Sequence, residues 1–322
     1  MPRMRRAAVA VVTAWTLAAC SATGPGAAPS ATGNAAPSAS TAATPPATPL
    51  PTVPPTRFDG RVTLAAGGWL QARCTGIGSP TILLEGGGTE GNIGGWRDIF
   101  PNTLAAHTTV CRYSRRGGEG SSAPPDPLTW ASMLGDADQL LETVRTEAGI
   151  DGPYVFVGWS FGGEVALGEA VAHRESTVGL VILDTDFPRD FMTQCRAAGR
   201  SQADCQGEFD SDRVAKQIEV GLVKSIRPLP GVPILLVSAM RPSPDCAVEP
   251  GATGVSYGLA GQEITAPDCD TLMRRIADTG LADWSTIGSV TQSRVDADHD
   301  GLIGTAGPQI AELIIRLISA RS

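Results

Sequence analysis

A serine between glycines follows a short apolar run in the middle of the chain. The run is Tyr154–Val157, and a G-x-S-x-G pattern from Gly158 to Gly162 comes directly after it, before residues at helical spacing. This pattern predicts a strand, a sharp turn with Ser160 at its apex, and a helix, the arrangement called a nucleophile elbow. Glycines are needed because larger side chains on so tight a turn would collide with the strand and the helix. A serine presented in this way can attack an acyl carbon.

Three histidines are available to take the proton of this serine, whose neutral hydroxyl is a weak nucleophile on its own. They are His107, His173 and His299. His107 lies just before an expected strand and His173 ends the helix after Ser160, and both are ordinary positions for a solvated or capping histidine. His299 lies in an acidic loop between the last expected strand and the last expected helix. It is either a loop histidine of an acidic turn or the general base.

The elements that must position these residues alternate between strands and helices. Short apolar runs predict strands, and apolar residues at helical spacing predict the helices between them. Such alternation implies right-handed crossovers and a mostly parallel sheet with helices on both faces. The expected strands are Phe58–Leu64, Trp69–Cys74, Thr81–Leu84, Thr109–Tyr113, Tyr154–Val157, Val178–Leu183, Pro233–Val237 and Ser289–Val295. The expected helices are Trp96–Ala106, Met133–Val144, Phe161–His173 and Ile310–Ile318.

The order of these elements resembles the α/β-hydrolase fold from about Phe58 to the end of the chain. Two antiparallel strands come first, and the serine turn follows the fifth strand. The stretch from Cys111 to Ser121 is similar to the D-R-x-G-x-G-x-S segment that follows strand four in this family, with Ser114 in place of the usual aspartate. The resemblance implies a mostly parallel eight-stranded sheet with helices on both faces and a small cap insertion.

The resemblance also implies roles for individual residues. Ser160 would be the nucleophile, and His299, in the loop where this fold places its catalytic histidine, would be the base. The backbone N–H groups of Phe161 and Gly87 would bind the oxyanion. Gly87 belongs to a glycine turn after the third strand, and the residue before that turn is Glu85, where relatives often have a histidine.

Two positions compete for the acid that orients the histidine. The usual position follows the seventh strand, Pro233–Val237, and the first acid there is Asp245, a few residues later than in the family. Some members instead place the acid after the sixth strand, which here is followed by Asp184 and Asp186. The sequence favours Asp245, with Asp184 as the alternative.

Residues 188–230 separate the sixth and seventh strands and include an expected helix, Val214–Ser225. In the α/β-hydrolase fold, an insertion at this point forms a cap over the active site. The alternative is a surface excursion with no role in specificity. Because the segment has few aromatic residues, it gives little indication of the substrate.

Six of the seven cysteines follow Cys20, and they indicate disulfides, because an even number in an exported chain is typical of a disulfide framework. Short loops favour the pairs Cys195–Cys205 and Cys246–Cys269, which leaves Cys74–Cys111, although six cysteines allow fifteen connectivities. In the α/β-hydrolase fold, the last pair would join neighbouring strands. The alternative is six reduced, buried thiols. The sequence contains no C-x-x-C pair, and we expect neither a metal nor an organic cofactor.

The N-terminus resembles an export signal. Residues 1–19 combine early arginines with the apolar stretch Ala7–Ala19, which is too short to span a bilayer. The stretch leads into Leu17–Cys20, which resembles a bacterial lipobox, so we expect a lipid on Cys20 to anchor the exported protein at the outer face of the cell membrane. An ordinary secretory signal with a chance cysteine is the alternative. Residues 20–56 then read as a disordered Ala/Pro/Thr linker, and residues 57–322 as the hydrolase domain.

Charge and composition narrow the function further. The formal net charge is −8 and the isoelectric point is about 5.0, without a basic patch, which argues against nucleic-acid binding. We therefore expect a serine hydrolase that cleaves a carboxylic ester, with a small-molecule ester or a lipid as substrate. A peptidase or thioesterase of the same fold is the nearest alternative. A non-catalytic binding lipoprotein on a hydrolase scaffold is the alternative from another class.

Overall fold

The structure is a computed structural model that describes residues 53–88, 91–189, 192, 195–196, 201–211, 213–241, 254–259 and 262–320. The predicted signal peptide, the lipidation site Cys20 and most of the predicted linker lie outside these residues. Asp245 and Cys246 also lie outside them. In the described part of the chain, no helix has both the length and the apolar character to cross a membrane.

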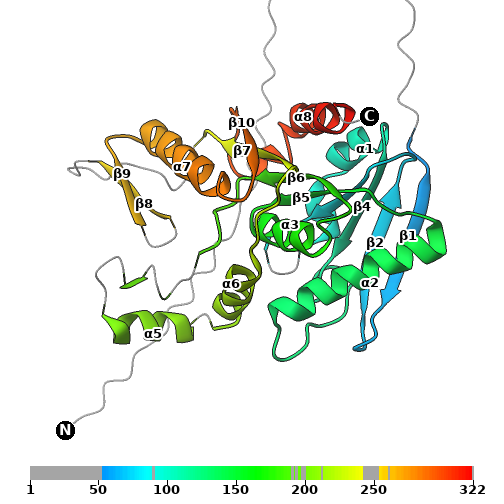
Figure 1. The fold of residues 1–322 in the computed structure, drawn as a ribbon, viewed down its shortest axis with the longest axis horizontal. Coiled ribbons are helices and arrows are strands. Elements are labelled where there is room, and N and C mark those ends of the chain that lie inside the picture. The colour runs from blue at the N-terminus through cyan, green and yellow to red at the C-terminus, as the bar shows by residue number, and fades with distance from the viewer. Residues whose placement is uncertain are drawn as a thin grey trace, which may run out of the picture. The chain divides into compact units, whose positions relative to one another are not determined.

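An eight-stranded sheet forms the centre of the molecule, in the order β1-β2-β4-β3-β5-β6-β7-β10 (Figure 1). The pairs β1–β2 and β2–β4 are antiparallel, and all the other neighbours are parallel. Its strands are β1 (Thr56–Thr63), β2 (Trp69–Thr75), β3 (Thr81–Glu85), β4 (Thr109–Ser114), β5 (Tyr154–Trp159), β6 (Thr177–Leu183), β7 (Pro233–Ala239) and β10 (Ser289–Val295). Each predicted strand is present, and the predicted α/β-hydrolase fold is confirmed.

Helices cover both faces of the sheet (Figure 1). On one face α2 (Trp130–Ala148) and α3 (Phe161–Ala172) share a core with the strands, and on the other α1 (Ile99–Ala105) and α8 (Gly307–Ser319) do so. Short 3-10 helices, η1 (Ile93–Trp96) and η2 (Asp300–Leu302), precede α1 and α8. Of the predicted helix Trp96–Ala106, the part Ile99–Ala105 is present as α1, and Trp96 is the last residue of η1.

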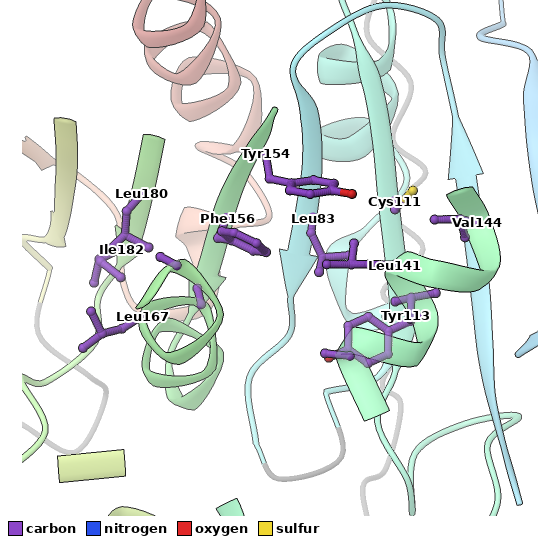
Figure 2. Close-up of a cluster of buried hydrophobic side chains, with 14 of the residues drawn as sticks. Leu83, Cys111, Tyr113, Leu141, Val144, Tyr154, Phe156, Leu167, Leu180 and Ile182 are labelled. Atoms are coloured by element: carbon purple, nitrogen blue, oxygen red, sulfur yellow. The ribbon is translucent and has the colours of Figure 1, made fainter. Parts of the chain in front are cut away.

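Alternate residues of each central strand supply the two cores. On β3, Leu83 belongs to the core with α2 and α3, whereas Ile82 and Leu84 belong to the core with α1 and α8. Figure 2 shows the first core, in which Leu83 and Phe156 of the sheet lie with side chains of both helices. Because both faces are covered, these strands are apolar throughout, and this is why the sequence shows them as continuous apolar runs.

The insertion between β6 and β7 contains α5 (Gln202–Ser211) and α6 (Arg213–Ser225). The helix expected at 214–225 is therefore present. Two buried residues of α6, Ile218 and Leu222, pack with Trp130 at the start of α2 in a small separate core. Phe161, the residue after Ser160, packs against the same core. The α6 helix thus reaches the edge of the predicted active site.

A second insertion, between β7 and β10, was not foreseen from the sequence. It contains an antiparallel pair, β8 (Val255–Leu259) with β9 (Gln262–Ala266), and the helix α7 (Cys269–Trp284). The helix begins at Asp268, whose side chain accepts a hydrogen bond from the N–H of Thr271 at 2.7 Å, a regular N-cap. Its last residue, Trp284, is fully buried and packs edge-on against the Phe187 ring, 5.1 Å between centroids.

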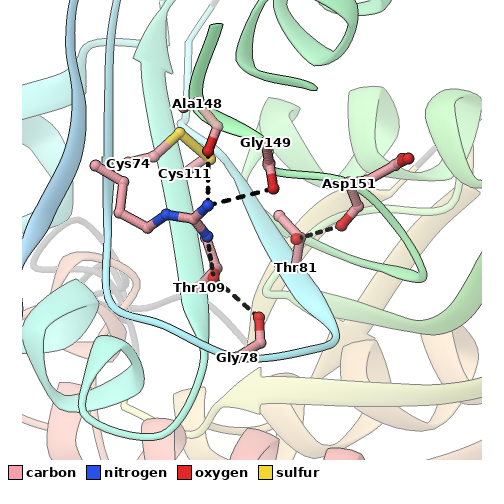
Figure 3. The surroundings of a disulfide bond; sticks show 9 residues. Cys74, Gly78, Thr81, Thr109, Cys111, Ala148, Gly149 and Asp151 are labelled. Atoms are coloured by element: carbon pink, nitrogen blue, oxygen red, sulfur yellow. Dashed lines mark hydrogen bonds between the residues drawn. A yellow bond between two sulfur atoms is a disulfide. The ribbon is translucent and has the colours of Figure 1, made fainter. Parts of the chain in front are cut away.

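Two of the predicted disulfides are present. Cys74 of β2 lies directly opposite Cys111 of β4, and their bond joins the two strands (Figure 3). It closes a loop of 37 residues, for which the chain-entropy model gives about 4 kcal/mol of stabilisation. The bond Cys195–Cys205 is also present. Cys269 is disulfide-bonded as well, while its predicted partner lies outside the described residues.

The start of β1 is fastened beside the first disulfide. The Arg57 guanidinium donates to the carbonyl oxygens of Ala148 and Gly149, at 2.6 and 3.2 Å, where α2 ends (Figure 3). Helix α2 ends at Gly149 because this residue adopts a left-handed conformation, with φ of 60°. The edge of the sheet and the end of the helix are thereby held together.

Candidate active site

Ser160 lies at the sharp turn between β5 and α3, as the sequence predicts. Its φ is 55°, a left-handed value that costs a non-glycine residue on the order of 1–3 kcal/mol. Three hydrogen bonds hold the turn: the Ser160 N–H donates to Leu183 O at 3.0 Å, and Ser160 O accepts from Gly163 N at 2.8 Å and from Thr185 Oγ1 at 2.7 Å. The turn is therefore strained and firmly supported, a combination that is typical of functional sites.

The glycines of the elbow allow neighbouring segments of the chain to pack closely against it. A Cβ atom on Gly158 would lie 2.1 Å from Gly162 O, and one on Gly162 would lie 2.0 Å from Glu85 O. A Cβ atom on Gly163 would lie 2.1 Å from Thr185 Oγ1. All three contacts are far below van der Waals distance, so any larger residue would push the turn away from its neighbours.

His299 is hydrogen-bonded to Asp184, the residue directly after β6. The atoms His299 Nδ1 and Asp184 Oδ2 are 2.7 Å apart. The second carboxylate oxygen, Asp184 Oδ1, accepts from the N–H of Ala239 at 3.0 Å, at the end of β7. Both oxygens are thus occupied and the carboxylate has one orientation. With its Nδ1–H donated to Asp184, the imidazole carries its lone pair on Nε2.

Trp159, the residue before Ser160, joins His299 to the elbow. Its indole Nε1 donates to His299 O at 3.0 Å, and the two rings lie 5.1 Å apart between centroids. The imidazole is therefore held beside the serine turn, although the two residues are far apart in the sequence. The His299 side chain keeps 41% of its surface exposed, so a small molecule can approach the ring.

Several carboxylates set the charge of this region. The hydrogen bond from His299 to Asp184 raises the pKa of the imidazole above its usual 6.5, against the opposing effect of desolvation, and the negative charges of Asp300 and Asp186 act in the same direction. Desolvation, and then the charge of Asp184, raises the pKa of Asp186 to about 6. The site thus stabilises a positive charge on the imidazole ring.

The glycine turn after β3 lies against the elbow. A Cβ atom on Gly87 would lie 2.8 Å from the Trp159 ring and 3.2 Å from Ser160 Cβ. The clash that a Cβ on Gly162 would make with Glu85 O shows that the same turn touches the start of α3. The two backbone segments that carry the predicted oxyanion donors, at Gly87 and Phe161, therefore meet beside Ser160.

The structure brings most of the predicted site residues into one corner, at the carboxyl ends of the parallel strands. This is where ligands bind in open α/β sheets. The other histidines lie elsewhere: His107 precedes β4, and His173 ends α3 with Nε2 2.8 Å from Asp138 Oδ1. Asp245, which the sequence favoured as the acid, lies outside the described residues, and its alternative Asp184 makes the contact with His299. Within the described ranges, no three His, Cys, Asp or Glu side chains are grouped as a metal would require.

Thr185 belongs to the site although the sequence analysis did not name it. Its hydroxyl donates to Ser160 O at 2.7 Å, and its carbonyl accepts from the Trp284 indole Nε1 at 3.4 Å. The residue therefore connects the elbow to α7 in the second insertion. The only feature of the sequence that could have indicated this role is the position of Thr185 directly after Asp184.

Comparison with known proteins agrees with this fold. Residues 82–313 match the sequence profile of the alpha/beta hydrolase family. Among solved structures, mouse alpha/beta hydrolase domain-containing protein 10 aligns with a TM-score of 0.55 at 15% identity, over 82% of this chain and 100% of that one.

Two further solved structures align over 82% of this chain, each with a TM-score of 0.51. A serine hydrolase involved in carbazole degradation has 18% identity and is covered over 99% of its length. An esterase from Pyrococcus furiosus has 10% identity and is covered over 90%. At these identities the similarity concerns the fold alone. No curated protein matches the sequence.

Proposed function

Because this chain belongs to the alpha/beta hydrolase family, we propose that it is a serine hydrolase that cleaves carboxylic esters of small molecules through an acyl-enzyme. The observation that carries the proposal is the 2.7 Å contact between His299 Nδ1 and Asp184 Oδ2, next to a strained serine turn. Two of the structural neighbours are named as an esterase and a serine hydrolase, which agrees with this class of reaction.

In the proposed mechanism, Ser160 Oγ attacks the acyl carbon while His299 Nε2 takes its proton. The N–H groups of Phe161 and Gly87 bind the oxyanion of the tetrahedral intermediate. The imidazolium then gives its proton to the leaving alkoxide, and an acyl-enzyme remains. A water molecule, deprotonated by the same Nε2, attacks the acyl carbon and releases the carboxylic acid and the free serine.

We assign the orienting acid to Asp184. Its carboxylate holds Nδ1–H in place, which keeps the lone pair on Nε2, and its charge stabilises the imidazolium that forms during attack. The hydrogen bond from Ala239 N–H supports this assignment, because it prevents the carboxylate from rotating away from the ring. Asp184 itself has a φ of 49°, so the backbone is held in an uncommon conformation at this residue as well.

Labelling with a fluorophosphonate tests the proposed function. The folded wild type is expected to take up one equivalent of the probe, because an activated serine displaces its leaving group. The Ser160→Ala variant should remain unlabelled, and Ser285→Ala, which removes an exposed serine at the end of α7, should label as the wild type does. A folded wild type that is not labelled would favour the non-catalytic binding protein.

We also propose that the protein is exported and carries its lipid anchor on Cys20. The support is the sequence of residues 1–20 alone. When the full chain is produced in a bacterial host, the Cys20→Ser variant is expected to move from the membrane fraction to the soluble fraction, because it has no thiol to be lipidated. Ser21→Ala should stay with the membrane. Equal membrane retention of Cys20→Ser and wild type would contradict lipidation.

A further inference from the structure

Two glutamates and an arginine are buried directly behind the glycine turn. Glu85, the last residue of β3, is 0% exposed, and Glu169 on α3 is 1% exposed. The Arg115 side chain, just after β4, is 5% exposed, and its Nη1 donates to Glu85 Oε2 at 2.8 Å. The same carboxylate oxygen accepts from the Tyr113 hydroxyl at 3.1 Å. Burying a charged group costs free energy unless the group is paired and hydrogen-bonded, so this cluster needs a physical explanation.

The two carboxyl groups differ in their hydrogen-bond partners. Glu85 Oε2 accepts from both Arg115 and Tyr113, whereas Glu85 Oε1 and both Glu169 oxygens are buried and have no hydrogen-bond partner among the described residues. Ionising both of two neighbouring buried carboxyl groups is costly, and among the described residues Arg115 is the guanidinium whose charge acts on both. Burial and the charge of Glu85 raise the pKa of Glu169 well above its usual range, whereas Arg115 and Tyr113 partly offset the effect of burial on the pKa of Glu85. Because both donors face Glu85 and none of the described donors reaches Glu169, the ionised form is favoured at Glu85 and the protonated form at Glu169.

The Arg115 guanidinium also holds the glycine turn itself. Its Nη2 donates to Gly86 O at 2.6 Å and to Gly88 O. The peptide unit is planar and trans, so the N–H of Gly87 points opposite to the C=O of Gly86. A bond from Arg115 to that carbonyl therefore fixes the direction of the Gly87 N–H, away from the arginine.

Arg115 also touches the other half of the predicted oxyanion site. Its guanidinium carbon lies 5.7 Å from the centre of the Phe161 ring, within the range of a cation–π contact. The backbone of Gly91 closes over the guanidinium, because a Cβ atom there would lie 2.5 Å from Arg115 Cζ. The side chain is thus enclosed between the turn, the elbow and the acid pair.

We propose that Arg115 is a positioning residue for oxyanion binding, and that ionised Glu85 and protonated Glu169 hold it in place. This inference rests on the proposed hydrolase function. The contacts of Arg115 given above are with Glu85, the glycine turn and the Phe161 ring. It sets the orientation of a backbone donor, which must be in place before the reaction because donors aimed in advance are what stabilise the oxyanion.

The test compares Arg115→Met with the wild type on a nitrophenyl ester and on a trifluoromethyl ketone, which binds serine hydrolases as a tetrahedral oxyanion adduct. The variant is expected to lose about 100- to 1,000-fold in kcat, as for loss of an oxyanion donor, with little change in KM. Affinity for the ketone should fall by the same factor. The control Arg145→Met removes an exposed arginine of α2 and should behave as the wild type.

The acid pair gives a second comparison. Glu169→Gln keeps a donor towards Glu85 in place of the carboxylic O–H, and should lose far less activity than Glu85→Gln, which removes the charge that pairs with Arg115. A larger loss of activity in Glu169→Gln than in Glu85→Gln would contradict the assignment of the proton to Glu169. Full activity and full ketone affinity in folded Arg115→Met would overturn the positioning role.

Two further readouts do not depend on turnover. The infrared spectrum of the wild type near neutral pH should contain a protonated-carboxyl band that is absent from Glu169→Gln, and the Gly87 N–H should exchange faster with solvent in Arg115→Met. If the wild type is inactive while both readouts are as expected, the hydrolase function fails and the buried network stands. If the wild type is active but shows no such band, and Gly87 N–H exchanges equally fast in Arg115→Met, the hydrolase function stands and the proposed role of the buried residues is wrong.

Discussion

An Asp184→Asn variant is expected to turn over a nitrophenyl ester about 10⁴-fold more slowly than the wild type while it keeps its fold. The reason lies in the two hydrogen bonds of the carboxylate. Ala239 N–H requires an acceptor, so the amide oxygen of the new asparagine must face it. The amide NH₂ then faces His299 Nδ1 and forces the tautomer with the proton on Nε2. That tautomer cannot accept the proton of Ser160.

Asp245→Asn is the matched comparison, because it makes the same change at the position that the sequence favoured. We expect it to retain most of the activity. Turnover of both variants, with circular dichroism to check the fold, decides between the two acids. A large loss in Asp245→Asn with little loss in Asp184→Asn would return the assignment to the loop after β7.

The pH dependence of the two variants gives an independent check. The base must be neutral to accept a proton, so kcat/KM should rise as pH increases through the pKa of His299. In the wild type, the hydrogen bond to Asp184 raises this pKa above 6.5, so the rise is displaced towards higher pH. Removing the carboxylate charge should move the rise to lower pH in Asp184→Asn. An unchanged profile would mean that Asp184 does not act on the imidazole.

The central sheet could be predicted from the sequence because its strands are buried on both faces. Leu83 and Phe156 face one core, their neighbours face the other, and the result is a run of apolar residues that periodicity detects. The serine turn could be predicted for a related reason. Its glycines at Gly158 and Gly162 are fixed by contacts with adjacent backbone, which any residue with a Cβ would break.

The sequence offered Asp184 only as the alternative partner of His299, because the choice between the two acids depends on one backbone conformation. Asp184 contacts both His299 and Ala239 with a φ of 49°, a value that aspartate adopts more readily than most residues but that remains uncommon and is not indicated by the local sequence. The guides in the sequence were the positions of the two acids after β6 and β7, and a position along the chain carries no information about where a side chain points.

The role of Glu85 was hidden for another reason. From the sequence it is a residue that replaces a common histidine, and a glutamate beside glycines suggests a solvated turn. Its burial depends on Glu169 and Arg115, which come from a helix and a loop far along the chain. The second insertion was missed because β8 and β9 are short and lack a continuous apolar run, so their pattern does not stand out.

A His299→Ala variant is expected to show the largest loss of activity, about 10⁶-fold in kcat, as for loss of the general base in other serine hydrolases. At 1.36 kcal/mol for each factor of ten, this equals about 8 kcal/mol of transition-state stabilisation. Adding Asp184→Asn to it should produce no further loss, because the acid acts only through the imidazole. If the activity losses of the two single variants multiplied in the double variant, Asp184 would contribute to the reaction independently of His299.

Arg115→Met should behave differently in the same background. It acts on the glycine turn, which touches Ser160 through Gly87 and does not involve the imidazole. Residual catalysis without the base comes from the oxyanion hole and from binding, so the double variant His299→Ala/Arg115→Met should be slower than His299→Ala alone. Single-turnover rates of the wild type, His299→Ala, Arg115→Met and the double variant measure this difference. A double variant as fast as His299→Ala would place Arg115 in the same unit as the base, contrary to the geometry of the turn.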